Sequence, residues 1–377
     1  MDILPMSQDT KTTESVSPSQ STPITVVSGP LGAGKTTLVN RLLQNPGGRR
    51  IAVIVNDMGE VNVDASLIER KTDEGVIDLS NGCICCQLQD DLVEESSRLA
   101  REREFDHLVV ETSGISEPLP VARALTRESA GSSDQYDLDT MVSVVDAYGF
   151  WKAFDPDEGL PDAAPTPERP LTDVMIDQIE FCDVLLLNKC DMVPDDDVET
   201  IETVLRELQP RATVHRTTYA EVDPEVVLDT DRFDFEDTKR APGWKRALAD
   251  GSEGDDHDHG GASAAEVHGV ESTVYERDRP FHPGRFDAWL DDWDGDLIRA
   301  KGFTWVASRP DEVLGVNQAG PSVQAGPIGE WGADEPATRL VFIGRSLDPD
   351  RLAAELDDCL VADEEREKTW HDDPFPR

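Results

Sequence analysis

Basic residues are scarce in this 377-residue sequence. It has 35 lysines and arginines against 78 aspartates and glutamates, which gives a formal net charge of -43 at pH 7. Such a surface repels nucleic acids and anionic membranes, so we expect neither as a partner. The acidic residues are spread through both halves of the chain, and 38% of all residues are hydrophobic, which argues against wholesale disorder. We interpret the charge as the adaptation of a folded, halophilic protein to high salt, where screening shortens charge repulsion.

Long hydrophobic runs and a disulfide framework are also missing. No apolar run approaches the roughly 18 residues that a membrane-spanning helix needs, and the N-terminus lacks a basic segment followed by an apolar one. These absences predict a cytoplasmic protein. Of only six cysteines, three lie within positions 83–86, too close together to bridge one another easily. In a reducing compartment, a cluster of this kind indicates metal or redox chemistry.

The sequence does contain an alternation of strand-like and helical segments. Short runs rich in Val, Ile and Leu predict buried parallel strands at 24–29, 51–57, 107–111, 141–147 and 183–189. Apolar residues with helical spacing lie between these runs, at 36–44, 90–104 and 197–208. This alternation predicts an α/β fold with a doubly wound, mostly parallel sheet and helices on both of its faces.

Changes in composition divide the chain into parts. Residues 1–22 lack periodicity and predict a disordered tail, whereas 23–240 hold the α/β domain. Residues 241–268 are rich in Gly, Ala, Asp and His, which cannot build a core, so we expect a linker there. A mixture of strand-like and helical segments at 269–362 predicts a second, smaller α+β domain, followed by a tail at 363–377.

A phosphate-loop motif is the strongest functional signal. GPLGAGKT at 29–36 fits the spacing G-x-x-x-x-G-K-[S/T], directly after an apolar strand and at the start of a helix. Its glycines allow the backbone to wrap round phosphates with the N–H groups pointing inward, beside the positive end of the helix dipole. We expect Lys35 to reach the β and γ phosphates and Thr36 to ligate Mg²⁺. A chance glycine-rich turn is the alternative, and the flanking strand and helix argue against it.

Two further motifs end later strands. The segment ETSG at 111–114 places Glu111 near the Mg²⁺ and the backbone N–H of Gly114 where it can sense a γ-phosphate. A carboxylate at a strand end is common, so Glu111 alone is a weak signal. The segment NKCD at 188–191 fits the base-reading pattern N-K-x-D, in which Asp191 accepts hydrogen bonds from guanine N1 and N2. Adenine has no such donor pair, so the sequence predicts GTP and argues against a small-molecule kinase.

A cluster of three cysteines is a second candidate site. Cys83, Cys85 and Cys86 lie in NGCICC at 81–86, ahead of a predicted helix. Three thiolates so near each other bind Zn²⁺ or Cu⁺ well. A structural zinc site normally has four protein ligands, so an open fourth position suits transfer of the ion better than permanent storage. Packing in a core and redox activity are the alternative interpretations of this cluster.

Two acidic segments are weaker candidates for metal binding. Asp57 and Glu60 follow the second predicted strand, in NDMGEVNVD at 56–64, and are candidate hard ligands for Mg²⁺ or for a transferred ion. A solvated acidic loop explains them equally well. In the linker, His257 and His259 alternate with aspartates, a pattern that collects Zn²⁺, Ni²⁺ or Co²⁺ weakly. An acidic linker in a salt-adapted chain needs no such role, so both interpretations stay open.

The order of these motifs resembles that of a known family. GPLGAGKTT, GCICC, ETSG and NKCD, followed by RPFHPGRFDAWL at 279–290 and RAKGFTWVASRP at 299–310, are similar to the CobW family of P-loop GTPases, including its zinc-chaperone members. The resemblance covers about residues 23–362, and GCICC is its most specific part. It implies a CobW-like P-loop GTPase domain at 23–240 and a CobW C-terminal-like domain at 269–362.

The resemblance also implies residue roles. Phosphate and Mg²⁺ are then held by the loop residues Gly29, Gly32, Ala33, Gly34, Lys35, Thr36 and Thr37, and guanine by Asn188, Lys189 and Asp191. The cysteine cluster holds a cargo metal, Glu111 matches the acidic Mg²⁺-site position, and Asp57 and Glu60 match switch residues. The candidate catalytic residues are Lys35, Thr36 and Glu111. No residue identifies itself as the group that positions water, so we expect slow intrinsic turnover.

The resemblance implies that a transition metal is bound together with GTP and is released to a client enzyme on hydrolysis. The resemblance therefore implies a GTP-hydrolysing metallochaperone that needs GTP, Mg²⁺ and Zn²⁺ and loads zinc into a client metalloprotein through the CxCC site. Co²⁺ and Ni²⁺ remain alternative cargoes, which corresponds to cobalt insertion in cobalamin biosynthesis or to maturation of another metalloenzyme. A non-enzymatic metal buffer is a further alternative, and the oligomeric state stays open.

Overall fold

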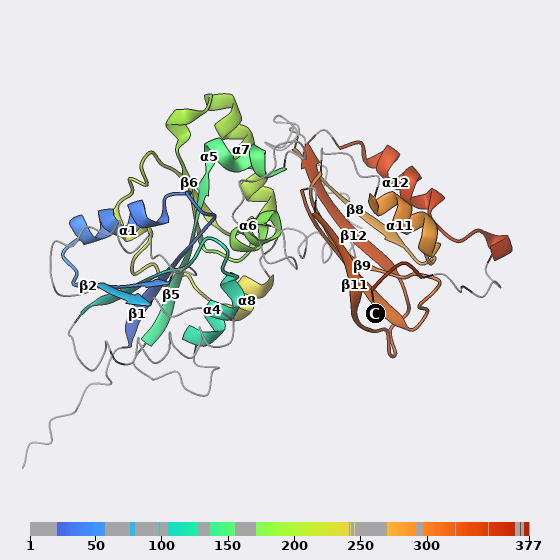
Figure 1. Ribbon diagram of the computed structural model, residues 1–377, viewed down its shortest axis with the longest axis horizontal. Coiled ribbons are helices and arrows are strands. Elements are labelled where there is room, and N and C mark those ends of the chain that lie inside the picture. The colour runs from blue at the N-terminus through green and yellow to red at the C-terminus, as the bar shows by residue number, and fades with distance from the viewer. Residues whose placement is uncertain are drawn as a thin grey trace, which may run out of the picture.

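Two sheets dominate the computed structural model, one in each half of the chain (Figure 1). The structure describes residues 21–56, 76–79, 98, 105–126, 136–154, 171–240, 242, 245, 270–291, 297–320, 322–345, 347–365, 370 and 373–376. The predicted disordered tail at 1–22 lies almost entirely outside these ranges, as does nearly all of the predicted linker at 241–268 and of the predicted helix at 90–104. No helix within these ranges is long and apolar enough to cross a membrane.

The first sheet has seven strands in the order β3-β2-β4-β1-β5-β6-β7, and all neighbouring pairs are parallel. The strands are β1 Thr22–Ser28, β2 Ile51–Asn56, β3 Val76–Leu79, β4 His107–Glu111, β5 Tyr136–Asp146, β6 Val184–Asn188 and β7 Thr213–Arg216. The runs of Val, Ile and Leu predicted the central strands because a parallel sheet covered on both faces needs apolar side chains on both. Sequence reasoning missed β3 and β7.

Helices cover both faces of this sheet, which confirms the predicted doubly wound α/β fold. They are α1 Lys35–Gln44, α4 Pro118–Leu125, α5 Ala147–Phe150, α6 Leu171–Glu180, α7 Asp195–Leu208 and α8 Phe235–Arg240, with the 3₁₀ turns η1 Trp151–Phe154, η2 Cys190–Met192 and η3 Pro224–Val226. Alternate residues of a strand face opposite sides. Val26 therefore packs in the core on the α6 and α7 side, and Val27 in the core beneath α1.

Helix α7 illustrates why these segments are helical. Its buried residues include Val198, Ile201, Leu205 and Leu208, whose spacing of three to four places them on one face of a helix. Three aspartates occupy its first turn, after Pro194, where they complement the positive end of the helix dipole.

The second sheet is antiparallel, with the order β11-β10-β9-β12-β8. Its strands are β8 Val270–Arg277, β9 Leu297–Thr304, β10 Glu312–Ala319, β11 Ser322–Glu330 and β12 Thr338–Arg345, and it is accompanied by α11 Pro283–Asp291, α12 Pro349–Asp358 and the 3₁₀ turn η4 Asp363–Glu365. The helices α11 and α12 share a core with residues of this sheet. This arrangement confirms the predicted smaller α+β domain.

The two domains share a hydrophobic core. Val270, Ile298, Ala319, Val341 and Ile343 of the second sheet belong to the same buried cluster as residues of α6 and α7. Each of these five residues is at most 2% exposed. Helices therefore pack on both faces of the second sheet, with α11 and α12 on one face and the helices α6 and α7 on the other (Figure 1).

Part of the segment predicted as a tail at 363–377 packs against the second domain. Phe375 is 5% exposed, and its ring lies 6.1 Å from that of Phe286. The guanidinium of Arg309 donates to the carbonyl oxygens of Phe375, at 2.6 Å, and Pro376, at 2.8 Å. Nothing in the local sequence pattern indicated this contact, because an aromatic residue near a chain end shows no periodicity.

Candidate functional site

The polar residues predicted as a nucleotide site come together at one edge of the parallel sheet. The phosphate loop follows β1, Glu111 ends β4 and Asn188 ends β6. Val27 of β1 is paired directly with Glu111. Because the carboxyl ends of parallel strands share an edge, this edge is where α/β proteins hold ligands.

The phosphate loop has the backbone geometry that its glycines allow. Gly29, Gly32 and Gly34 have φ angles of 135°, 77° and 113°, in the region that favours glycine. A Cβ atom at Gly29 would lie 2.2 Å from the carbonyl oxygen of Val144, so no larger residue fits there. Lys35 is 4% exposed, and its Nζ donates to the carbonyl oxygens of Gly29 at 2.9 Å and Pro30 at 3.0 Å. The loop therefore curls round the lysine ammonium.

Thr36 and Glu111 meet at the start of α1. The Thr36 hydroxyl donates to Oε1 of Glu111 at 2.7 Å, and Glu111 is only 1% exposed. Gly114 lies against the loop, since a Cβ atom on it would approach the backbone nitrogen of Leu31 to 2.6 Å. Two oxygens of the kind that Mg²⁺ prefers thus stand side by side, next to a backbone segment that contacts the phosphate loop.

Asn188 connects three loops. Its Nδ2 donates to the carbonyl oxygen of Ala33 in the phosphate loop at 2.9 Å. Its Oδ1 accepts from the backbone N–H of Ala220 at 2.8 Å and from the hydroxyl of Thr217 at 3.1 Å. The side chain is buried, so these three bonds fix its orientation. Asn188 holds the phosphate loop, the end of β6 and the loop after β7 in one arrangement.

The other residues of the NKCD segment face different partners. Lys189 adopts a left-handed backbone conformation with φ 60°, and its Nζ lies 2.6 Å from Oδ2 of Asp146 at the end of β5. Asp191 is exposed in the 3₁₀ turn η2. Burial raises the pKa of the Cys190 thiol, which keeps it protonated at neutral pH.

Sequence reasoning missed Asp146, Thr217 and Ala220. Asp146 had a usable signal, because it ends the apolar strand β5 just as Glu111 ends β4. Thr217 and Ala220 follow β7, a four-residue strand too short and too polar to be recognised from periodicity.

Comparison with known proteins gives the family. A model of the CobW/HypB/UreG nucleotide-binding domain matches residues 23–216, and a model of the cobalamin synthesis protein cobW C-terminal domain matches residues 270–360. The chain belongs to the CobW/HypB/UreG family. The match confirms the family predicted from the order of the motifs.

Similar proteins span most of this CobW-family chain. Zinc-regulated GTPase metalloprotein activator 1 of Dictyostelium discoideum is 37% identical, and the match covers 91% of this chain and 80% of that protein. Zinc chaperone CobW of Sinorhizobium sp is 30% identical, and the match covers 85% of this chain and 92% of that protein. The crystal structure of Zn(II)-bound YjiA GTPase from E. coli is 22% identical, with a TM-score of 0.42, and covers 90% of this chain and 99% of that one.

Several predicted metal-site residues of this CobW-family chain lie outside the described residues. They are Cys83, Cys85 and Cys86 of the cysteine cluster, Asp57 and Glu60 of the acidic segment, and His257 and His259 of the linker. Among the residues that the structure describes, no group of three or more His, Cys, Asp or Glu side chains could hold a metal ion.

The cysteines that the structure does describe lack the character of metal ligands. Burial raises the pKa of the Cys182 thiol well above its usual range, and that of Cys359 to about 11. Both thiols are therefore protonated at neutral pH, whereas a metal ligand must be a thiolate. The cysteine cluster at 83–86 remains the predicted cargo site.

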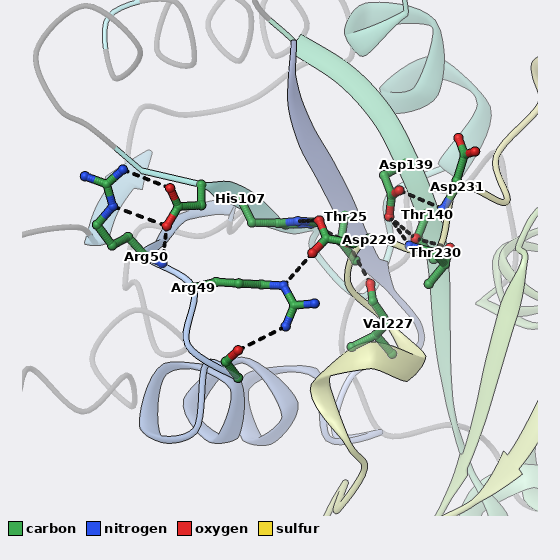
Figure 2. Close-up of polar contacts among 12 residues, drawn as sticks. Thr25, Arg49, Arg50, His107, Asp139, Thr140, Val227, Asp229, Thr230 and Asp231 are labelled. Carbon is green, nitrogen blue, oxygen red and sulfur yellow. Dashed lines mark hydrogen bonds and ion pairs between the residues drawn. The ribbon is translucent and has the colours of Figure 1, made fainter. Parts of the chain in front are cut away.

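A Thr-His-Asp arrangement lies at the opposite end of the sheet (Figure 2). His107, the first residue of β4, contacts Oγ1 of Thr25 through Nε2 at 2.8 Å and Oδ1 of Asp229 through Nδ1 at 3.0 Å. Thr25 and His107 are both 0% exposed, and Thr25 Oγ1 also lies 2.7 Å from the carbonyl oxygen of Val227. No substrate can reach a threonine buried in this way, so the arrangement fastens the loop after η3 to the sheet.

Proposed function

We propose that this P-loop GTPase loads a transition metal, zinc in the first place, into client metalloproteins under the control of GTP binding and hydrolysis. The observation that carries the proposal is the 2.9 Å hydrogen bond from Asn188 to the carbonyl oxygen of Ala33, which joins the base-reading segment to the phosphate loop. Two segments joined in this way suit a guanine nucleotide lying across both. The relatives named as a zinc chaperone and as a zinc-regulated GTPase metalloprotein activator support zinc as the cargo.

The phosphate loop supplies the phosphate contacts in this proposal. The backbone N–H groups of Gly32, Ala33, Gly34 and Thr37 surround the phosphates, and Gly29 allows the close turn. The ammonium of Lys35, already held inside the loop by two carbonyl oxygens, neutralises charge on the β and γ phosphates. The N–H of Gly114 contacts the γ-phosphate from the other side.

Mg²⁺ fits beside Thr36 and Glu111. The Thr36 hydroxyl and the Glu111 carboxylate are hard oxygen donors in direct contact at the phosphate-loop end of β4, and Mg²⁺ prefers such ligands. Asp57 supplies a third oxygen in the proposal. When bound, Mg²⁺ neutralises negative charge on the phosphates. Glu111, at 1% exposure, holds its carboxyl group in place for the ion.

Guanine selectivity rests on the NKCD segment. The exposed carboxylate of Asp191 accepts from the N1 and N2 groups of the base, and the aliphatic part of Lys189 packs along it. The Lys189 ammonium is restrained by Asp146, at 2.6 Å, which fixes the side chain before the base arrives. Asn188 holds the surrounding loops together.

The cargo site is formed by Cys83, Cys85 and Cys86, between the phosphate loop and β4 in the chain. Three thiolates leave one position of a tetrahedral zinc site to a group of the client, which makes release possible. Glu60 and the linker residues His257 and His259 are secondary candidate ligands. In the proposal they capture the metal ion before it reaches the cysteines. The client is a metalloprotein whose own ligands complete the zinc coordination.

The proposal is tested by titrating Zn²⁺ into the purified full-length protein in molar KCl with a competing chelator. Three states are compared: nucleotide-free, with Mg²⁺ and GDP, and with Mg²⁺ and a non-hydrolysable GTP analogue. We expect the GTP analogue alone to raise zinc affinity about fivefold or more, the usual scale of coupling between two sites. Cys83→Ala should abolish the zinc binding that responds to nucleotide.

Cys359→Ala is the matched control, because it removes a protonated thiol from the C-terminal core and should leave zinc affinity unchanged. Equal zinc affinity in all three states would favour a metal buffer over a nucleotide-controlled chaperone. The same titration with Co²⁺ and Ni²⁺ decides among the cargoes, since a stronger nucleotide response with either ion would replace zinc.

A further inference from the structure

Helix α6 lies between the segment that follows β4 and the sheet of the C-terminal domain (Figure 1). Asp173, Asp177 and Glu180 are spaced i, i+4 and i+7, so they share one face of the helix. Gln178 is displaced from Asp177 by about 100° round the helix axis, because an α-helix has about 3.6 residues per turn. The helix therefore presents different polar groups to two different neighbours.

Gln178 holds the segment after β4 by its amide group. The side chain is 0% exposed, and its Nε2 donates to the carbonyl oxygen of Ser116 at 3.0 Å and to that of Gly114 at 3.4 Å. Its Oε1 has no hydrogen-bond partner in the described part of the chain. Leaving a buried acceptor without a partner costs stability. An apolar residue of similar shape would avoid that cost, so the value of glutamine here lies in its two donated bonds.

The segment held by Gln178 touches the phosphate loop. The N–H of Ser116 donates to the carbonyl oxygen of Ser113 at 3.0 Å, which closes a turn over 113–116. Within that turn, the backbone of Gly114 lies so close to Leu31 of the phosphate loop that a Cβ atom would be 2.6 Å from the Leu31 nitrogen. Glycine has no side chain to fix its position, so the course of this turn depends on what holds its carbonyl groups.

The acidic face of α6 is fixed to the C-terminal domain. Arg299 of β9 forms two hydrogen bonds with Glu180, at 2.8 and 3.1 Å. Asn317 of β10 donates to Oδ1 of Asp173 at 3.3 Å. These contacts are made by separate strands and anchor both ends of the helix. Gln178 therefore projects from a helix that cannot shift easily, and its amide is a fixed support for the turn.

We propose that Gln178 is a positioning residue for GTP hydrolysis, which sets the Gly114 backbone at the place where it meets the γ-phosphate. The proposal rests on the proposed function, in which Gly114 contacts that phosphate. GDP has no γ-phosphate. The position of the Gly114 backbone therefore affects the binding and hydrolysis of GTP but not the binding of GDP. Selective loss of GTP affinity and turnover is therefore its signature.

The chain contains a matched control in Gln209. This glutamine is also 0% exposed, its Nε2 donates to the carbonyl oxygen of Glu180, and its Oε1 likewise has no hydrogen-bond partner among the residues described. Its bond goes to the last residue of α6, two positions after Gln178, and not to the turn over 113–116. Gln178→Met and Gln209→Met each remove a buried amide that donates to the main chain, to two carbonyl groups from Gln178 and to one from Gln209, so both should lower the melting temperature. Only Gln178→Met removes the hold on Gly114.

The experiment measures the affinity of full-length wild type and both variants for GDP and for a non-hydrolysable GTP analogue, together with kcat and KM. In Gln178→Met we expect affinity for the GTP analogue and kcat to fall about fivefold, the loss typical of one buried hydrogen bond, with unchanged affinity for GDP. Gln209→Met should leave both affinities and kcat at the wild-type values.

A second variant guards against a simple folding defect. In Gln178→Glu an ionised carboxylate cannot donate to the two carbonyl oxygens, whereas a protonated carboxyl can donate to one of them. Burial raises the pKa of such a carboxyl. We therefore expect kcat of Gln178→Glu, relative to wild type, to recover as the pH is lowered from about 8 towards 6. Gln209→Glu should show no such recovery.

The outcomes separate this inference from the proposed function. If wild type binds the GTP analogue no better than it binds an adenine nucleotide, or does not hydrolyse GTP, the proposed function is wrong. If wild type behaves as a GTPase but Gln178→Met weakens GDP and the GTP analogue equally, or matches Gln209→Met, the positioning role is wrong. Selective loss for the GTP analogue together with acid recovery in Gln178→Glu supports it.

Discussion

Arg299 on β9 and Glu180 on α6 form a two-point ion pair between the domains, 2.8 Å from Nε to Oε1 and 3.1 Å from Nη2 to Oε2. The side chain of Arg299 is 0% exposed and that of Glu180 is 6% exposed. Asp177 lies 3.7 Å from the same guanidinium. Burial and the neighbouring Arg299 lower the pKa of Lys301, which also lies near Glu180. The C-terminal sheet thus places positive charge against an acidic face of a nucleotide-domain helix.

Removing one member of this pair should be strongly destabilising. In Arg299→Met, the Glu180 carboxylate stays buried without its main partner, and such a loss typically costs about 3–5 kcal/mol. We expect the free energy of unfolding of the full-length protein, measured by urea titration, to fall by that amount. Arg351→Met is the matched control, because its partner Glu355 is solvent-exposed and such pairs contribute about 0.5 kcal/mol. Equal losses in the two variants would contradict the structural importance of the interdomain pair.

Asn188→Ala should weaken GTP and GDP alike. The substitution removes the bonds to Ala33, Thr217 and Ala220, and these bonds hold the base and phosphate segments together for either nucleotide. We expect about a tenfold to hundredfold loss of affinity, consistent with several lost hydrogen bonds. Fluorescence titration with labelled GDP and GTP measures it. A loss restricted to GTP would contradict this role and would resemble the effect expected of Gln178→Met instead.

Glu111→Gln should weaken Mg²⁺ binding and slow hydrolysis. The amide keeps a hydrogen-bonding oxygen for the Thr36 hydroxyl. It removes the carboxylate that we propose as a ligand of Mg²⁺. We expect kcat to fall about tenfold or more and the Mg²⁺ concentration for half-maximal rate to rise, since the metal stabilises charge in the transition state. Phosphate release over a range of Mg²⁺ concentrations provides the measurement. An unchanged Mg²⁺ response would remove Glu111 from the metal site.

Acid should destabilise the fold through His107. Burial lowers its pKa below the usual value of 6.5, although the Asp229 carboxylate opposes that effect (Figure 2). Between the folded pKa and about 6.5 the unfolded chain binds more protons, so stability from this group is present above pH 6.5 and is lost as the pH falls. The free energy of unfolding should fall by at most about 1.4 kcal/mol per pH unit through this group.

Thermal melts of wild type and His107→Gln between pH 7.5 and 5 test this expectation. The variant should lose less stability on acidification than wild type. His215→Gln provides the comparison: burial also lowers the pKa of His215, but this residue lies partly exposed on β7, so its substitution should have a smaller effect in the same direction. A steeper loss in His107→Gln than in wild type would show that the folded protein prefers the protonated imidazole.

The sequence could predict much of the parallel sheet and of the nucleotide site. Runs such as ITVVSG and DVLLLNK have apolar residues at consecutive positions because both faces of the strand are covered, and that pattern is visible without knowing the partners. The glycines of the phosphate loop are equally readable, because the turn they form is local and their φ angles need no distant contact.

The partners of those segments could not be predicted in the same way. The strand order β3-β2-β4-β1-β5-β6-β7 brings Glu111 and Thr36 together across 75 positions of sequence, and Asn188 and Ala33 across 155. Asp146, Thr217 and Ala220 became part of the site for the same reason. Helix α6 was missed because its polar residues face protein and not solvent, which hides the amphipathic pattern.

The sequence by itself determined the phosphate loop, the NKCD segment and the strands that carry them, because each depends on the chemistry and backbone preferences of consecutive residues. Only the tertiary structure decided that Gln178 holds the Gly114 turn and that Arg299 is buried against Glu180, 119 positions away. A buried amide or ion pair is stable only where folding supplies its partner at hydrogen-bonding distance, and residues far apart in the chain acquire that distance through the packing of α6 between two sheets.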